Sequence, residues 1–268
     1  MRVHHHLMTW NGWLSKNKLP FELPAVLDEV KSAGYDGIEG GGDEKANGPA
    51  NVYQSRVGAA GLQVAAWGAS VTYNPWAPST EQFQRDVDYA AALDVRMIVV
   101  CGGFMPSSRR TTLASDYTMF GDNLASHAQY AAKNSQVLCF HPHLGCVVET
   151  NREIELLIAA YPQLQLCIDT GHLAAAGEDP LVVLEKQSAR IQAIHLKDWN
   201  PSENAFTELG NGIVDLVGIK QWMNRHTFKG PVIVERDSPP IPAIASASIS
   251  RSAWASAVTQ ANEASASA

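Results

Sequence analysis

The chain lacks the features that mark several classes of protein. Its 268 residues carry 20 Lys and Arg against 27 Asp and Glu, a net charge of -7, so the basic excess of a dedicated nucleic-acid binder is missing. No apolar run is long enough to span a membrane. Residues 1–3 lead straight into histidines, without a signal peptide, and we expect a cytoplasmic, reducing location. We therefore expect neither a nucleic acid nor a membrane as a partner.

Cysteine is also scarce. There are four, and three of them stand in apolar runs that read as strands, so we predict buried thiols rather than disulfides or a zinc knuckle. No low-complexity linker divides the chain, and we predict one domain over residues 1–268. The composition turns to Ala and Ser from about Ile241. Residues 248–262 are a candidate last helix, and we expect a frayed end from about residue 263.

The chain does contain a repeated alternation of strand-like and helix-like segments. Helical spacing is seen at residues 24–33, 79–93 and 150–161, the last opened by a capping pattern at Thr150. Such alternation predicts a parallel sheet, and we favour an α/β (β/α)8 TIM barrel over an open doubly wound sheet. The predicted strands are 2–7, 37–39, 63–67, 97–101, 137–141, 164–169, 191–196 and 231–235.

The decisive pattern is where polar residues fall. His141, Asp169, His195 and Glu235 each stand at or just after the C-terminal end of a predicted strand. In a barrel these ends meet at one mouth, where the active sites of such barrels lie. An open sheet would instead spread them along a line.

Carboxylates and imidazoles at strand ends suit a divalent metal. Asp169 ends a buried strand and His172 follows three residues later. The same pattern would be seen if Asp169 only capped the next helix and His172 lay on the surface. Alternation puts His195 and Lys197 on one side of their strand, where Lys197 either contacts substrate or pairs with its aspartate neighbour. Glu235 follows three β-branched residues and needs a partner, since an unpaired buried charge is costly.

The segment after the fifth predicted strand is rich in candidate ligands. It reads HPHLGCVVET, and His141, His143 and Glu149 are each able to reach such a metal. The sum of these signals predicts a metal site.

These residues resemble the xylose-isomerase-like barrels, a superfamily of sugar isomerases and epimerases. The resemblance rests on Glu149, on DTGH from Asp169, on HLKD from His195 and on Glu235, and the stretch 141–198 is most similar to the inosose dehydratase branch. The loop 206–215 also resembles that branch. The match is specific over the second half of the chain.

The resemblance implies one divalent metal, with Mn first and Co, Mg or Zn as alternatives. Its ligands would be Glu149, Asp169, His195 and Glu235, with His141 as the other candidate for the first position. Endonuclease IV, in the same superfamily, needs extra histidines at the ends of the second and third strands. Here those ends read Gly40-Gly41 and Trp67-Gly68, which argues against phosphodiester cleavage.

The expected reaction begins with removal of a proton α to a carbonyl of a keto-sugar or keto-cyclitol. A single metal would polarise that carbonyl, and the base candidates are Glu149, His141, His143 and Glu235. Elimination, as in a dehydratase, would also need an acid, for which His172, His143 and Lys197 are candidates. We favour elimination. A sugar isomerase or epimerase is the alternative, and a noncatalytic sugar-binding subunit without stoichiometric metal is a further one.

Four residues are candidate substrate contacts. His5 represents the His4–His6 triplet, Glu39 ends the second strand, and Trp67 and Trp199 follow strands, where indole faces stack on sugars. Each has an alternative role: the histidines could be core residues, Glu39 could have a structural role at the strand end, and the tryptophans could pack between the helices and the barrel. The expected partner is a small sugar or cyclitol, and a homo-oligomer stays open.

Overall fold

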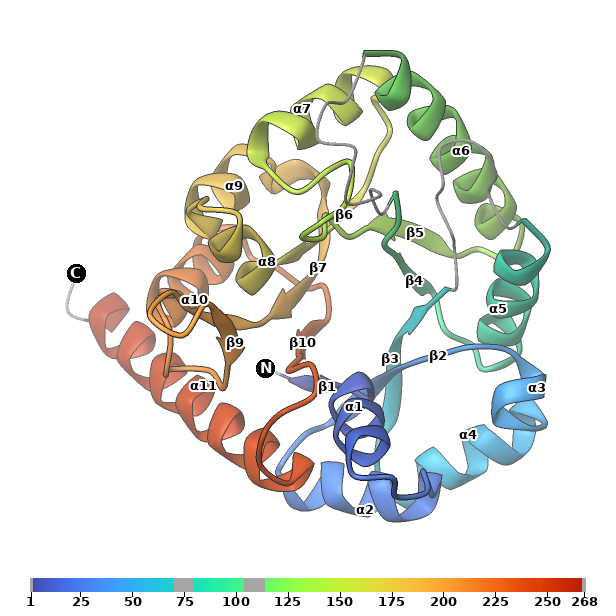
Figure 1. The fold of residues 1–268 in the computed structure, drawn as a ribbon, viewed down its shortest axis with the longest axis vertical. Helices are drawn as coiled ribbons and strands as arrows, with labels where there is room; N and C mark the ends of the chain where they lie inside the picture. The colour runs from blue at the N-terminus through green and yellow to red at the C-terminus, as the bar shows by residue number, and fades with distance from the viewer. Residues whose placement is uncertain (1, 70–79, 104–113, 267–268) are drawn as a thin grey trace.

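The computed structural model describes residues 2–69, 80–103 and 114–266, and in this part of the chain eight parallel strands close into a barrel (Figure 1). Around the ring the strand order is β1-β10-β7-β6-β5-β4-β3-β2. This confirms the predicted (β/α)8 barrel. The strands are β1 (His4–His6), β2 (Gly37–Gly41), β3 (Gln63–Gly68), β4 (Met97–Val100), β5 (Val137–Phe140), β6 (Leu166–Asp169), β7 (Ile191–Leu196) and β10 (Val232–Val234).

Helices surround the strands in Figure 1. A short antiparallel hairpin of β8 (Asp198–Asn200) and β9 (Ala205–Thr207) interrupts the alternation after β7. The helices are α1 (Met8–Lys16), α2 (Leu23–Ser32), α3 (Glu44–Asn47), α4 (Ala50–Ala59), α5 (Thr80–Ala92), α6 (Ala114–Lys133), α7 (Asn151–Ala160), α8 (Thr170–Ala175), α9 (Pro180–Lys186), the 3-10 turn η1 (Ser188–Arg190), α10 (Leu216–Arg225) and α11 (Ala243–Ala266).

Local chemistry sets several helix boundaries. At α7 the hydroxyl of Thr150 accepts from the N–H of Glu153, and the Glu153 carboxylate accepts from the N–H of Thr150, so the predicted cap is a complete capping box. The first residue of the helix expected at 79–93 lies outside the described residues. Helix α11 spans the predicted residues 248–262 and continues to Ala266, in a segment rich in alanine, the best helix former.

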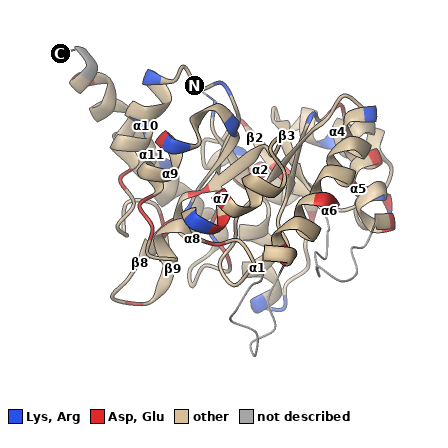
Figure 2. Cartoon of the chain, turned by 90° about the horizontal axis from the view of Figure 1, so that it is seen from above, with Lys and Arg blue, Asp and Glu red and all other residues tan. Residues whose placement is uncertain are grey.

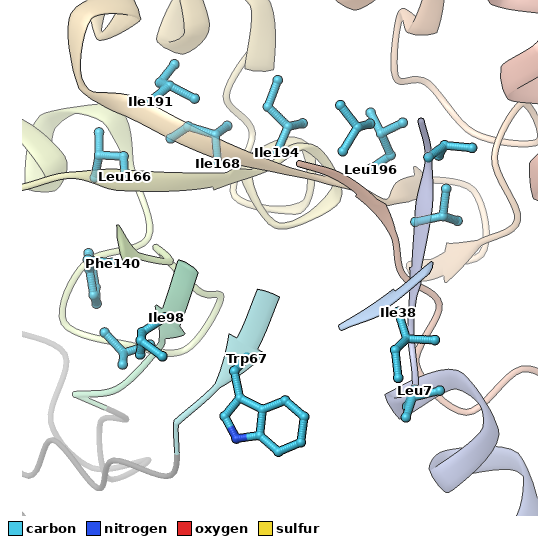
Figure 3. Close-up of a cluster of buried hydrophobic side chains, with 14 of the residues drawn as sticks. Leu7, Ile38, Trp67, Ile98, Phe140, Leu166, Ile168, Ile191, Ile194 and Leu196 are labelled. Carbon is cyan, nitrogen blue, oxygen red and sulfur yellow. The ribbon is translucent and has the colours of Figure 1, made fainter. Parts of the chain in front are cut away.

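The core has two parts. One cluster takes a single small or medium residue from each of six strands, which can meet only inside the barrel: Ala66, Val99, Cys139, Cys167, Ala193 and Ile233. A larger shell, part of which Figure 3 shows, packs between strands and helices and contains residues such as Ile168, Ile194 and Leu196. Cys139, Cys146 and Cys167 are buried free thiols and Cys101 is a half-buried one, in agreement with the prediction.

The loops after the strands gather at one end of the barrel. In Figure 2 the β8–β9 hairpin and α1 lie on the lower side of the molecule, whereas both chain termini lie on the upper side. None of the helices in the described ranges has the length and hydrophobicity needed to span a membrane.

Candidate active site and metal centre

Four of the predicted residues meet at the mouth of the barrel. Asp169 ends β6 and lies beside His195 of β7 in the sheet register. Glu235 directly follows β10, and His141 directly follows β5. All four side chains are buried. The barrel therefore brings together what an open sheet would have separated.

These side chains form two overlapping groups with metal-ligand chemistry. One contains His141, Asp169 and His172, and the other contains Asp169, His195 and Glu235. In each group one nitrogen or oxygen per residue lies within 4.8 Å of the others. Three of the buried atoms have no hydrogen-bond partner within the described residues: Nε2 of His141, Oδ2 of Asp169 and Nδ1 of His195.

Orphaned buried polar atoms are rare in proteins and call for an explanation. Two imidazole nitrogens and two carboxylates are the donors that Mn²⁺, Co²⁺ and Zn²⁺ accept. The residues present therefore fit a divalent metal, with His141, Asp169, His195 and Glu235 as the ligand set.

Lys197 lies next to these groups and is fully buried. Its Nζ donates to Oε1 of Glu235 at 2.8 Å and to Oδ2 of Asp237 at 2.8 Å, and Oδ2 of Asp169 lies 3.7 Å away. Burial by itself lowers the pKa of Lys197, but Glu235 and Asp169 outweigh it and raise the pKa above its usual value. Lys197 is thus a fixed cation facing three carboxylates, which leaves negative charge for a metal to balance.

A second buried network crosses the mouth from the other side. Glu39 Oε2 lies 2.8 Å from Nε2 of His195, and Glu39 Oε1 lies 3.5 Å from Nε2 of His6. Burial raises the pKa of Glu39, but His195 and His6 oppose it and lower the pKa to about 2. Glu39 is therefore an ionised carboxylate held between two imidazoles.

The histidines after β5 and β6 pack against one another, and the planes of the His143 and His172 rings are tilted by 39°. The ring centroids of His143 and His172 are 3.7 Å apart. Nδ1 of His143 lies 2.8 Å from the carbonyl oxygen of Leu144, which only accepts, so Nδ1 donates in that bond. Burial lowers the pKa of His172 to about 2 and that of His141 to about 4. The rings of His172 and His141 are therefore neutral.

A cleft of about 900 Å³ opens above these groups, a size suited to a small organic substrate. Its walls include Leu23, Tyr53 and Arg56 from the first helices. The polar residues on its floor are His6, Glu39, His141, His143, His195, Glu235 and Asp237.

A second cleft of about 850 Å³ lies at the opposite end of the barrel, where its walls include Arg2, Gln63 and Arg96. None of the residues of the two metal-ligand groups lines it. In barrels of this type the N-terminal end serves stability rather than catalysis.

Several predicted residues lie elsewhere. Glu149 is half-buried, and its carboxylate accepts from the N–H of Gly145 at 2.6 Å, outside both metal-ligand groups. His5 projects to the outside of the barrel, where its ring packs edge-on against Trp10 and Tyr35. Neither is therefore brought to the floor of the cleft.

The two candidate tryptophans are also displaced from the cleft. Trp67 is fully buried against Tyr53 and Tyr89, under the helices that cover β3. Trp199 stands on the β8–β9 hairpin and packs against Phe206. Trp67 therefore has the helix–barrel packing role that was the alternative for these residues, whereas Trp199 packs within the hairpin.

The structure adds three residues that the sequence did not single out. Asp237 lies on the floor of the cleft, two residues after Glu235. Alternation continued past the strand end would have found it. His6 takes the place at the mouth that we assigned to His5. Phe206 lies under the ammonium of Lys197, with the ring centroid 4.8 Å from Nζ, and the sequence carried no signal for it.

Comparison with known proteins agrees with this architecture. The family model described as xylose isomerase-like TIM barrel matches residues 27–255. The chain belongs to this family. Among curated relatives, an inosose dehydratase of Clostridium beijerinckii is 26% identical over 246 residues, which cover 80% of this chain and 82% of that protein.

Solved structures show the same fold. A D-tagatose 3-epimerase-like protein superimposes with a TM-score of 0.79 at 14% identity, covering 98% of this chain and 99% of that one. The probable 3-DHS dehydratase AsbF of Bacillus anthracis superimposes with a TM-score of 0.71 at 13% identity, covering 94% and 98%. The fold is thus shared by proteins named as epimerases and as dehydratases.

Proposed function

We propose that this chain is a divalent-metal-dependent dehydratase that removes water from a keto-cyclitol or keto-sugar. The observation that carries the proposal is the set of orphaned buried atoms on His141, Asp169 and His195, which lie with Glu235 at the mouth of the barrel. Of these four residues, His141, His195 and Glu235 also line the cleft. The relatives named inosose dehydratase support the substrate class.

When bound there, a divalent metal supplies a Lewis acid that polarises the substrate carbonyl and makes the neighbouring C–H acidic. The chain has to remove that proton. Both oxygens of Glu235 already contact Lys197 and His195, whereas the imidazole of His143 lines the cleft in which a substrate would lie. We assign His143 as the base.

We propose elimination rather than epimerisation, for the following reason. An epimerase that inverts a carbon needs a second group on the other face of the substrate, commonly a carboxylate. Here Glu149, one of the base candidates from the sequence, accepts from the N–H of Gly145, and the residue that directly follows β5 is His141 rather than a carboxylate. One imidazole serves a syn elimination, because the α-proton that His143 takes can pass to the leaving hydroxyl. The C–O bond breaks, water departs and a C=C bond conjugated to the carbonyl remains.

The experiment follows the protein with Mn²⁺, keto-inositol and several keto-sugars in heavy water by proton NMR. Deuterium entering α to the carbonyl would demonstrate carbon-acid chemistry, and an enone product would identify elimination. An epimer or an aldose–ketose pair would contradict the dehydratase and support the isomerase alternative. Absence of exchange with every substrate, in protein supplied with Mn²⁺, would favour the noncatalytic sugar-binding subunit.

The assignment of His143 is tested by His143→Gln. We expect exchange and product formation to fall by about two to four orders of magnitude, the usual contribution of a positioned base, while Mn²⁺ still binds. His226→Gln is the control, since His226 contacts Glu185 at the far end of α10. Unchanged exchange in His143→Gln would return the role to Glu235.

A further inference from the structure

Glu39 and His195 contact each other although their strands are not neighbours. Strand β2 pairs with β1 and β3, whereas β7 pairs with β6 and β10. The Glu39 side chain crosses the mouth, and both it and His195 are only 1% exposed. The contact is therefore a built feature of the site rather than a consequence of strand pairing.

The two nitrogens of His195 have different surroundings. Nε2 lies 2.8 Å from Glu39 Oε2, in hydrogen-bond geometry. Nδ1 lies 2.9 Å from Glu235 Oε2, but without the geometry of a hydrogen bond, and it is one of the three orphaned atoms. In this hydrogen bond the ring nitrogen donates and the carboxylate oxygen accepts, so the shared proton belongs to Nε2. Nδ1 is the nitrogen that faces the metal-ligand group.

We infer that Glu39 is a positioning residue for the metal centre, which keeps the proton of His195 on Nε2 and thereby presents Nδ1 as the ligand. The inference rests on the proposed function, in that it takes the mouth to bind a divalent metal. Carboxylate–histidine–metal arrangements of this kind fix both the tautomer and the orientation of the ring.

The second oxygen of Glu39 fits the same role. Oε1 lies 3.5 Å from Nε2 of His6, which comes from the adjacent strand β1. The carboxylate is thus anchored on one side by His6 and presents its other oxygen to His195. A Glu39 engaged at both oxygens holds the site in shape rather than binding a substrate hydroxyl, the role that the sequence suggested for it.

Glu39→Gln tests the inference. The amide is a weaker acceptor, and with its NH2 turned to Nε2 it favours the tautomer that places the proton on Nδ1. We expect the Kd for Mn²⁺, measured by calorimetry on protein stripped of metal, to rise about tenfold to hundredfold. Glu44→Gln is the matched control, because it removes one carboxylate from an exposed position five residues later and should leave the Kd unchanged.

The outcomes separate the two proposals. A wild-type protein that fails to bind Mn²⁺ contradicts the proposed function. A wild-type protein that binds, with Glu39→Gln binding equally well, overturns the role of Glu39 alone. In the expected case, saturating Mn²⁺ should also restore much of the turnover lost by Glu39→Gln, since the variant lacks affinity rather than a group that touches the substrate.

A second measurement needs no variant. In protein labelled with ¹⁵N at histidine and loaded with Zn²⁺, long-range proton–nitrogen spectra report which imidazole nitrogen carries hydrogen. We expect His195 to show hydrogen on Nε2 and a metal-shifted Nδ1. The reverse tautomer would overturn the inference even if Glu39→Gln does not fold.

Discussion

Oε1 of Glu235 lies 2.8 Å from Nζ of Lys197, and both side chains are buried where β7 and β10 end. The hydroxyl of Thr170 holds the Lys197 backbone in place. It donates to the Lys197 carbonyl at 2.6 Å and accepts from the Lys197 N–H at 3.0 Å. The ammonium therefore has one position. It offsets part of the charge that Asp169, Glu235 and Asp237 bring into the mouth, and the metal site and the stability of the barrel depend on the same contacts.

Replacing Lys197 with Met should separate these two roles. The variant keeps the length of the side chain but leaves three carboxylates without their cation, so we expect the metal-free protein to lose about 3–5 kcal/mol of unfolding free energy. Mn²⁺ should stabilise the variant more than the wild type, because a dication supplies the missing charge. Urea unfolding with EDTA and with Mn²⁺ measures both effects.

The control for this change is Lys186→Met. Lys186 forms an exposed ion pair with Glu155 on the outside of the barrel, and the loss should stay within about 1 kcal/mol. A Lys197→Met protein as stable in EDTA as the wild type would show that the carboxylates tolerate burial without the ammonium.

Asp169→Asn should remove the metal while preserving the fold. Oδ1 of Asp169 accepts from the N–H of His172 at 2.8 Å and so caps α8, and Asn is an equally good cap. Oδ2 is the orphaned atom of the metal-ligand group, and its charge is lost in the variant. We expect metal retained after dialysis, measured by plasma mass spectrometry, to fall from near one equivalent to a small fraction.

Asp179→Asn is the matched control, since Asp179 caps α9 by accepting from the N–H of Leu181 at 2.8 Å and lies in no metal-ligand group. Its metal content should equal that of the wild type. Equal metal content in the Asp169→Asn protein would remove Asp169 from the ligand set.

Sequence reasoning reached the barrel and the strand-end residues because both follow from periodicity. Asp169 and His195 end apolar runs, and parallel strands in a closed ring bring such ends together whatever the loops do. The sequence could not tell which side chains of β1 face the mouth of the barrel. Three successive histidines offer no alternation of polarity, so nothing in the sequence says that His6 rather than His5 faces the mouth.

The positions of the remaining candidate residues depend on loop conformation and side-chain packing, which the sequence pattern does not reveal. Glu149 was placed at the metal by sequence order, but the turn at Gly145, whose φ is +80°, brings a backbone N–H to its carboxylate. Trp67 neighbours Ala66 on β3, and the small residue turns into the narrow barrel interior while the indole fills the wider shell under the helices. The space available on each face of the strand, rather than the polarity of the side chain, decides which of two apolar neighbours faces the barrel interior.

The buried His5 makes stability depend on pH. Burial lowers the pKa of His5 from 6.5 to about 4, so between these values the unfolded chain binds a proton that the folded chain does not. Stability should therefore fall as pH decreases from about 6.5 to about 4, by up to about 3 kcal/mol for this residue.

Urea midpoints of the wild type and His5→Asn at pH 7, 6 and 5 test this. Asn can still donate to the carbonyl oxygen that Nδ1 of His5 contacts at 3.0 Å, but it does not titrate. We expect the variant to be less stable at pH 7, because the contact with Trp10 is lost, and to show the shallower decline toward pH 5. Parallel declines would mean that His5 stays neutral in the unfolded chain or charged in the folded one.

Asp198 should hold the loop beside the mouth in place. Its carboxylate accepts from the N–H groups of Trp199 at 2.9 Å, Gly210 at 2.9 Å, Gly212 at 3.1 Å and Val214 at 3.0 Å. In Asp198→Asn the amide NH2 meets N–H donors that it cannot satisfy, and we expect a loss of about 1–3 kcal/mol.

Hydrogen exchange at residues 209–214 is the direct measurement for this change, and it should rise in Asp198→Asn while exchange in β5 and β6 stays unchanged. The control is Asp215→Asn, which keeps a capping side chain at the N-terminus of α10, where Asp215 accepts from Gly218 N–H at 2.8 Å. Because Asp198 adjoins Lys197, a loosened loop should also weaken Mn²⁺ binding slightly. Unchanged exchange at 209–214 would show that the chain around the loop, and not the carboxylate, fixes its conformation.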